Sequence, residues 1–192
     1  MTREEIIEIF QKTNALLSGH FLLTSGKHSN QYFQCAKVLQ YPHHTKKIVA
    51  EIADYFRNFE IDSVIAPAMG GLIVGYETAR QLNKRFVFTE RENKEMQLRR
   101  GFEIKKGEKF LVCEDVVTTG GSVRETIEIV KNGGGEIAGV AMIVDRSNGK
   151  IDFGVPQKSV LQMEVITYEP EECPLCKQGL PLVKPGSRKI FV

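Results

Sequence analysis

The residues whose types and spacing best suit chemistry lie in the stretch 110–122, FLVCEDVVTTGGS. It begins with apolar residues typical of a strand, carries two adjacent carboxylates, Glu114 and Asp115, and ends in a turn rich in Thr and Gly. Backbone N–H groups and hydroxyls in such a turn, followed by the positive end of a helix, can surround a phosphate group. Carboxylates beside that turn can accept hydrogen bonds from sugar hydroxyls. The stretch therefore predicts a site for a phosphorylated sugar.

Two other nucleotide-binding motifs do not fit this turn. A Walker A loop requires GxxxxGK followed by Ser or Thr, and the lysine is missing. A dinucleotide fingerprint requires GxGxxG, which is also missing.

Residues before position 61 predict helices and a pair of strands. Thr2 and Glu5 have the spacing of a capping box, and an apolar stripe continues to Leu17, so the chain should open with a helix. Two short strands should follow, around a polar turn at 25–30, and residues 45–59 form an amphipathic helical pattern.

From position 61 onward, strands alternate with helices. Expected strands are 61–68, 85–88, 109–117, 137–145 and 160–168, with helices ending at Leu82 and, from Val123, at Asn132. This rhythm predicts an α/β fold with a mostly parallel sheet flanked by helices, which binds ligands at the carboxyl ends of its strands. Glu114 and Asp115 fall at such an end, where they need not be buried.

The bulk composition is that of one globular domain. The 192 residues are 42% hydrophobic and 26% charged, with a formal net charge of +2. No basic field points to nucleic acid, and neither a bilayer-spanning run nor a signal peptide is recognisable, so we expect a cytoplasmic protein without a membrane partner. We expect a helix and a small hood in 1–44, a core in 45–168 and an irregular tail in 169–192, which completes the hood.

The four cysteines and four histidines give weaker signals. Cys35 and Cys113 lie in apolar surroundings typical of buried thiols. Cys173 and Cys176 form one CPLC, which lacks the second ligand pair of a zinc site, so a structural turn is favoured while metal binding and a disulfide stay open. His28 is a candidate ligand contact, whereas the other histidines, His20, His43 and His44, are expected in surface or turn positions.

The stretch CEDVVTTGGS resembles the phosphoribosyl-diphosphate (PRPP) binding motif of type I phosphoribosyltransferases. Almost the whole chain resembles the orotate branch of that family. HFLLTSGKHSNQYF is similar to the segment that covers the pyrimidine, APAMGG to the pyrophosphate loop, and VDRS to the strand end whose arginine meets orotate. TEREN and LRRGF are similar to the start and end of a mobile catalytic loop, and CPLCKQGLPLVKPGSR to the tail of one bacterial and archaeal branch.

The resemblance implies a type I phosphoribosyltransferase fold and transfer of a 5-phosphoribosyl group from PRPP to orotate. The products would be orotidine 5'-monophosphate and pyrophosphate, in de novo pyrimidine (UMP) biosynthesis. It also implies Mg²⁺, held mainly by PRPP with no direct protein ligand assigned, and a homodimer with shared active sites.

The resemblance also assigns roles to residues of this chain. Expected PRPP contacts are Glu114, Asp115, Val116, Val117, Thr118, Thr119, Gly120, Gly121, Ser122, Ala68, Met69, Gly70, Gly71 and Arg91. Expected catalytic residues are Lys94, Arg91 and Asp115. Expected orotate contacts are Thr118, Arg146, Tyr32 and Phe33, and Arg99 and Arg100 belong to the mobile loop.

Two positions depart from the pattern of many relatives, which carry lysines where this chain has Thr24 and Gly70. Diphosphate binding should then depend more on Mg²⁺, on the backbone amides of 68–71 and on the long, cationic polar stretch after position 88, which has the length of a lid.

An ion pair with Asp145 or Asp152 is an alternative role for Arg146.

Two alternative functions would use the same phosphate-binding turn, TTGGS. One is transfer of the phosphoribosyl group to a purine base, and the other is that of a non-enzymatic regulator that senses PRPP. The short LLTSGKHSNQYF segment and Arg146 are unlike a purine-covering hood. A regulator would need a nucleic-acid-binding element, which a near-neutral chain does not favour.

Overall fold

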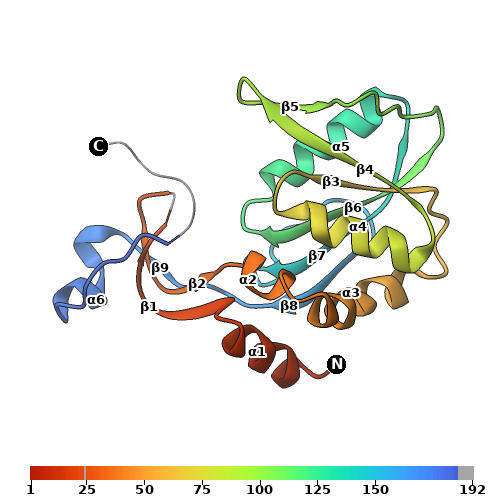
Figure 1. The fold of residues 1–192 in the computed structure, drawn as a ribbon. Helices are drawn as coiled ribbons and strands as arrows, with labels where there is room; N and C mark the ends of the chain where they lie inside the picture. Colours follow the sequence, from red (N-terminus) through yellow and green to blue (C-terminus); the bar gives the residue numbers. More distant parts are fainter. Residues whose placement is uncertain (24, 186–192) are drawn as a thin grey trace.

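The fold is known from a computed structural model that describes residues 1–23 and 25–185. Its centre is a six-stranded sheet of order β5-β4-β3-β6-β7-β8 (Figure 1). The bounds are β3 Ser63–Pro67, β4 Arg85–Glu92, β5 Glu95–Leu98, β6 Lys109–Val117, β7 Glu136–Asp145 and β8 Gln157–Gln162. All neighbours are parallel except β4 and β5, so the predicted α/β class is confirmed.

Helices cover both faces of this sheet. α3 (Pro42–Phe56) and α4 (Gly71–Leu82) pack on one face and α5 (Gly121–Asn132) packs on the other (Figure 1). Side chains of β6 alternate between the two apolar clusters: Leu111 and Cys113 join the α3 and α4 side, and Val112 joins the α5 side. Burial on both faces explains why this strand reads as a continuous apolar run until its two acids.

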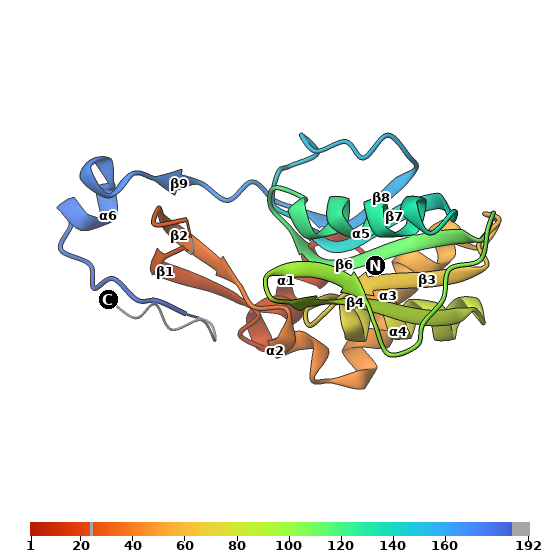
Figure 2. The ribbon, with the colours of Figure 1, turned by 90° about the horizontal axis from the view of Figure 1, so that it is seen from above.

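A second, smaller sheet forms the hood beside the core. It consists of β1 (Leu16–Leu22), β2 (His28–Phe33) and β9 (Thr167–Tyr168), all antiparallel, and α6 (Pro174–Lys177) packs next to it. Figure 2 shows the hood projecting from one side of the core. β8 ends only a few residues before β9 begins, so the hood lies at the carboxyl edge of the main sheet.

Three short elements complete the description: α1 (Arg3–Lys12), α2 (Ala36–Leu39) and the 3₁₀ turn Pro170–Glu172. The capping box of α1 is confirmed, since Thr2 Oγ1 accepts from Glu5 N at 3.2 Å and Glu5 Oε2 accepts from Thr2 N at 2.8 Å. The expectation that the helix continues to Leu17 is wrong. Asn14 has a left-handed φ of 55°, which ends the helix and redirects the chain into β1.

Two further expectations are corrected. Residues 160–168 were expected to form one strand, but they belong to β8 and β9, which lie in different sheets. The long loop expected after position 88 is largely a hairpin. β4 continues to Glu92 and reverses through Asn93 and Lys94, both with positive φ, into β5. Two consecutive left-handed residues are the geometry of a tight hairpin turn.

Among the described residues, no helix has the length and apolar character that a membrane span requires.

Candidate functional site

The site lies where the chain reverses direction across the main sheet. From β3 the chain passes through α4 to β4 on one side, whereas β6 pairs with the other side of β3. Loops that follow strands on opposite sides of such a switch point leave a crevice between them. The two loops here are 68–71, after β3, and 118–120, after β6.

The turn after β6 requires glycine at one position. Gly120 has a φ of 76°, and a Cβ placed there would lie 3.0 Å from two ring carbons of Phe153. α5 begins at Gly121, two residues earlier than expected, and no side chain caps it. The first N–H groups of a helix have no acceptor within the helix, so they face the turn as anion donors.

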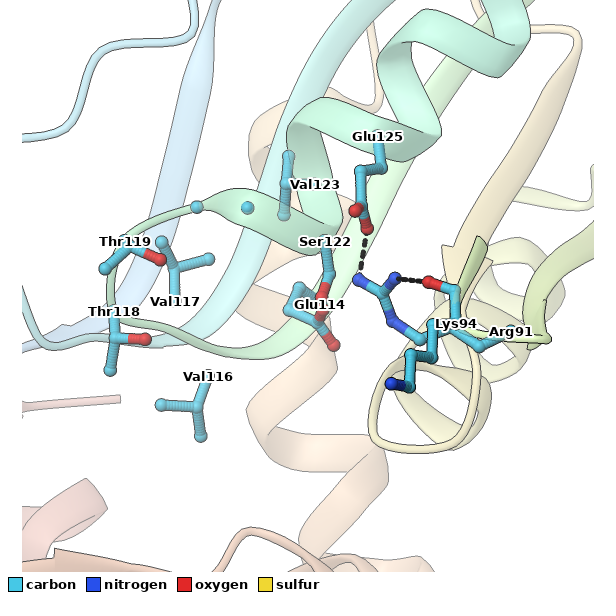
Figure 3. A pocket seen from close by; sticks show the side chains of 12 residues that line it. Arg91, Lys94, Glu114, Val116, Val117, Thr118, Thr119, Ser122, Val123 and Glu125 are labelled. Carbon is cyan, nitrogen blue, oxygen red and sulfur yellow. Dashed lines mark hydrogen bonds and ion pairs between the residues drawn. The ribbon is translucent and has the colours of Figure 1, made fainter. Parts of the chain in front are cut away.

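A first pocket of about 580 Å³ opens in front of this turn (Figure 3). Its lining includes Glu114, all residues from Val116 to Val123, and three side chains from elsewhere, Arg91, Lys94 and Glu125. The structure thus gathers most of the residues predicted to bind PRPP around one cavity.

The two adjacent carboxylates point to different cavities. Because successive side chains alternate along a strand, Glu114 lines the first pocket and Asp115 lines a second pocket on the hood side. The loop after β3 packs closely on both: a Cβ at Gly70 would lie 2.4 Å from Asp115 Oδ1, and one at Gly71 would lie 3.2 Å from Glu114 Oε1. Glycine at position 70 therefore permits this close approach.

Glu114 is buried, contrary to the expectation that a strand end would leave it open to water. Burial raises the pKa of Glu114 well above its ordinary value, and the neighbouring charge of Asp115 raises it further. Burial also raises the pKa of Asp115, although hydrogen bonds from Glu114 and from the backbone N–H of Val116, at 2.8 Å, act against this. The pair therefore favours a ligand that brings hydrogen-bond donors or positive charge.

The second pocket, of about 590 Å³, lies between the core and the hood. All four residues predicted to contact orotate, Tyr32, Phe33, Thr118 and Arg146, are in its lining. Val116, Thr118 and Thr119 line both pockets, so the two cavities meet at the turn after β6.

Arg146 lies in this pocket with an unsatisfied donor. Its Nε atom is buried and has no hydrogen-bond partner among the described residues. The ion pair considered with Asp145 is not formed, since that carboxylate accepts from Ser147 and Gly149, and no pair with Asp152 occurs within the described chain. Burial lowers the pKa of Arg146 from its very high ordinary value, and an anion in the pocket would offset this desolvation.

The four cations expected in the lid separate into two pairs. Arg91 and Lys94 line the first pocket, where Arg91 Nη1 donates to Lys94 O at 2.7 Å and the guanidinium also pairs with Glu125. Figure 3 shows the Lys94 side chain extending from the hairpin turn into the pocket. Arg99 instead forms an ion pair with Glu92, with 2.9 Å between Arg99 Nη2 and Glu92 Oε1.

Arg100 pairs with Glu90, at 2.8 Å, and neither Arg99 nor Arg100 is in the described pocket lining.

The loop 68–71 presents fewer amides than expected. Ala68 N donates to Thr89 O at 2.7 Å within the sheet, so its amide is already engaged. Met69 is exposed. Thr24, the other departure from the family pattern, lies outside the described residues.

Several lining residues were not anticipated. Lys27, Gln34 and Thr167 line the second pocket and Glu125 lines the first. Glu125 lies one helical turn after Gly121 on α5, a spacing that places it on the side of the helix that faces the turn. His28, expected near the base, is buried beside His20 and Cys176 and is not among the residues described in the pocket lining.

The fold and the two pockets define an α/β protein with adjoining cavities at the switch point of its sheet. The family model described as "Phosphoribosyl transferase domain" matches residues 37–169, and the chain belongs to that family. Within it, the chain groups with the orotate phosphoribosyltransferases: it is 62% identical to the orotate phosphoribosyltransferase of Desulforamulus reducens, over 99% of this chain and 100% of that one.

Solved structures agree on the fold. The orotate phosphoribosyltransferase of Aeropyrum pernix matches with a TM-score of 0.71 at 25% identity, over 82% of this chain and 93% of that one. An adenine phosphoribosyltransferase of Rhodothermus marinus matches with a TM-score of 0.68 at 22% identity, over 83% and 99% of the two chains. The second likeness concerns the fold alone.

Replacing Glu114 with Gln should stabilise the ligand-free protein at high pH. Glu114 ionises near its ordinary pKa of about 4.3 in the unfolded chain but at higher pH when folded. The contribution of the protonated carboxyl to stability is therefore complete below the unfolded pKa and is lost as pH rises through the folded pKa. We expect the Tm of Glu114→Gln to exceed that of the wild type by a margin that grows as pH rises above about 4.3 and levels off above the folded pKa.

Thermal unfolding followed by circular dichroism measures this margin. Glu128→Gln, at an exposed residue of α5, serves as the control. Its Tm should differ from that of the wild type by an amount that does not vary with pH. A margin for Glu114→Gln that is constant, or that shrinks as pH rises, would contradict the assigned burial cost.

Proposed function

We propose that this chain transfers the 5-phosphoribosyl group of PRPP to orotate in an Mg²⁺-dependent reaction that releases pyrophosphate, a step of de novo pyrimidine biosynthesis. The observation that carries the proposal is the junction of the two pockets. The first pocket, in front of the turn after β6, and the second pocket, where Arg146 has a donor without a described partner, share Val116, Thr118 and Thr119. A sugar phosphate in the first cavity would therefore present its C1 atom to a base in the second.

The ribose phosphate would be held by the turn and the two acids. The 5-phosphate accepts hydrogen bonds from the N-terminal amides of α5 and from the hydroxyls of Thr118 and Thr119. Glu114 and Asp115 accept from the ribose hydroxyls, which supplies the donors that their raised pKa values call for.

The leaving pyrophosphate gains negative charge as its bond to C1 breaks. Lys94 and Arg91, from the β4–β5 hairpin, line the first pocket and would stabilise that charge. The amides of Gly70 and Gly71, which lie outside the described lining of that pocket, would add donors. Arg91 must then exchange its present partner, Glu125, for the diphosphate. In this role the hairpin acts as the lid expected from the sequence.

The carboxyl pair is compatible with Mg²⁺ on PRPP. Hard divalent cations take oxygen ligands, and a nearby positive charge would favour the ionised forms of Glu114 and Asp115. When bound, Mg²⁺ neutralises part of the charge on the diphosphate.

The base would lie under the hood. The guanidinium of Arg146 can bind the orotate carboxylate or a ring carbonyl at two points, which would satisfy its Nε atom. Tyr32 and Phe33 would cover the ring, and Thr118 would add a contact. A ring nitrogen then forms a bond to C1 as the bond from C1 to the pyrophosphate oxygen breaks, and the proton of that nitrogen passes to the leaving pyrophosphate or to water.

Two further features of the proposal rest on the family resemblance. The protein would act as a homodimer, in which the hairpin of one subunit can reach the site of its partner. It would work in the cytoplasm.

The alternatives make different demands on the second pocket. Adenine phosphoribosyltransferases share the fold, so the fold does not select the base. A half-buried arginine whose buried Nε donor has no partner among the described residues favours an anionic base over a neutral purine. A regulator that only senses PRPP would not need an arginine in a second pocket that adjoins the first.

The direct test mixes the protein with PRPP, Mg²⁺ and orotate. We expect loss of orotate absorbance with an equal release of pyrophosphate, and no reaction when a chelator removes Mg²⁺. Adenine, guanine and hypoxanthine serve as competing acceptors. Turnover with a purine and none with orotate would overturn the proposal.

Replacing Lys94 with Ala should slow the chemical step. Its charge is most needed when the leaving group carries extra negative charge, so we expect kcat to fall by about 10²-fold while the KM for PRPP changes much less. Arg100→Ala is measured beside it and should have a smaller effect, because Arg100 follows the hairpin and pairs with Glu90. If Lys94→Ala leaves kcat unchanged, the catalytic charge belongs to Arg99 or Arg100 instead.

Replacing Arg146 with Ala should weaken orotate binding selectively. Hydrogen bonds to a charged group contribute about 1.5–3 kcal/mol, so we expect the KM for orotate to rise roughly 10- to 100-fold with little change for PRPP. Arg57→Ala, at an exposed arginine paired with Asp54, is the control. Equal losses for both substrates would show that Arg146 has a structural role.

A further inference from the structure

Four side chains with metal-ligating atoms converge in the hood. They are His20 on β1, His28 on β2, and Cys173 and Cys176 at α6, and one ligand atom from each lies within 4.8 Å of all the others. His20, His28 and Cys173 are buried, and Cys176 lies at the exposed side. None of the four is in the described lining of the two pockets, so the cluster is separate from the proposed active site.

The distances match those between ligands of a single zinc ion. Zn–S bonds of about 2.3 Å and Zn–N bonds of about 2.0 Å, in a tetrahedron, separate sulfur from nitrogen by roughly 3.5 Å. Cys173 Sγ and Cys176 Sγ lie 3.5 and 3.7 Å from His20 Nε2, and Cys176 Sγ lies 3.3 Å from His28 Nδ1. The two ring nitrogens are 2.9 Å apart, against roughly 3.3 Å in an ideal tetrahedron.

Hydrogen bonds among these groups do not account for the arrangement. His20 Nδ1 lies 2.8 Å from the carbonyl oxygen of Leu180, and donation there leaves Nε2 with its lone pair. That one lone pair faces three polar atoms, His28 Nδ1 and the two sulfurs. A cation at the centre accepts electron pairs from all four atoms at once, and a backbone carbonyl behind a ligating histidine is the usual support of a metal site.

We propose that His20, His28, Cys173 and Cys176 hold a structural Zn²⁺ ion. Two thiolates and two imidazoles in a closed tetrahedron are a ligand set that favours zinc. CPLC was expected to form a structural turn without a second ligand pair. The β1–β2 hairpin supplies that pair from 153 residues earlier in the sequence, and the expected surface or turn position of His20 is also wrong.

The ion would fasten the tail to the hairpin. Within the described chain, the main apolar cluster reaches the hood through Leu16, Phe33 and Val165, and outside that cluster the hood buries Phe21 and Leu23. Farther out, the tail is joined to β1 by two backbone hydrogen bonds of Val183, to His20 O at 2.8 Å and from Leu22 N at 2.9 Å. A small unit with so little apolar core commonly needs a metal to stay folded.

Metal analysis of the full chain, prepared without a histidine tag and under reducing conditions, tests the proposal. We expect about one equivalent of zinc per chain. Replacing zinc with Co²⁺ should give the visible absorption of a tetrahedral cobalt site together with a thiolate charge-transfer band. Chelation should lower the Tm, and added Zn²⁺ should restore it.

Matched variants locate the site. Cys176→Ala and His20→Asn should lose the zinc and the thiolate or histidine contribution to the cobalt spectrum, whereas Cys113→Ala and His43→Asn should keep one equivalent. Substoichiometric zinc with no tetrahedral cobalt spectrum in the reduced wild type would overturn the proposal. So would zinc retained in both Cys176→Ala and His20→Asn, or a Cys173–Cys176 disulfide in the protein as isolated from reducing cytosol.

Discussion

The site depends on the burial of Glu114 beside Asp115 at the carboxyl end of β6. Burial makes ionisation of Glu114 unfavourable, and the neighbouring charge of Asp115 makes it more so, which together raise the pKa of Glu114. Gly70 and Gly71 let the loop after β3 pack closely against these carboxylates, of which Glu114 is buried and Asp115 is half-buried at the second pocket. We propose that a bound ribose and an associated cation stabilise this pair, so that the cost of burying Glu114 contributes to selectivity.

Other parts of the molecule position groups around that pair. Gly120 turns the chain so that α5 points its N-terminal amides at the first pocket, and the hairpin after β4 brings Lys94 to the opposite wall. β2 contributes residues both to the second pocket and to the proposed zinc site. It carries Tyr32 and Phe33 to the second pocket, and its first residue, His28, joins the proposed zinc site. A metal that fixes the hood would thereby also fix the cover of the proposed base site.

Much of this was predictable from local sequence, and particular residues show where prediction stopped. The bounds of β6 and the position of the turn after it followed from an apolar run, two acids and a Thr-Gly sequence. The β4–β5 hairpin was missed because its strands are polar at the edge of the sheet and its turn, Asn93-Lys94, lacks the glycine that usually marks one. Burial of Glu114 depends on the loop at Gly70, which comes from another strand. The cluster of His20 with Cys173 depends on a contact across 153 residues, which no local pattern encodes.

The central claim is that binding of PRPP draws the buried carboxyl pair into its ionised form. Calorimetric titration of Mg²⁺–PRPP into the protein without orotate, in buffers of different ionisation enthalpy and across a pH series, measures the protons exchanged on binding. The wild type should release protons in a range of pH where Glu114→Gln releases fewer, because donors and positive charge lower the raised pKa of Glu114. Identical proton release by the two proteins at every pH would contradict the account.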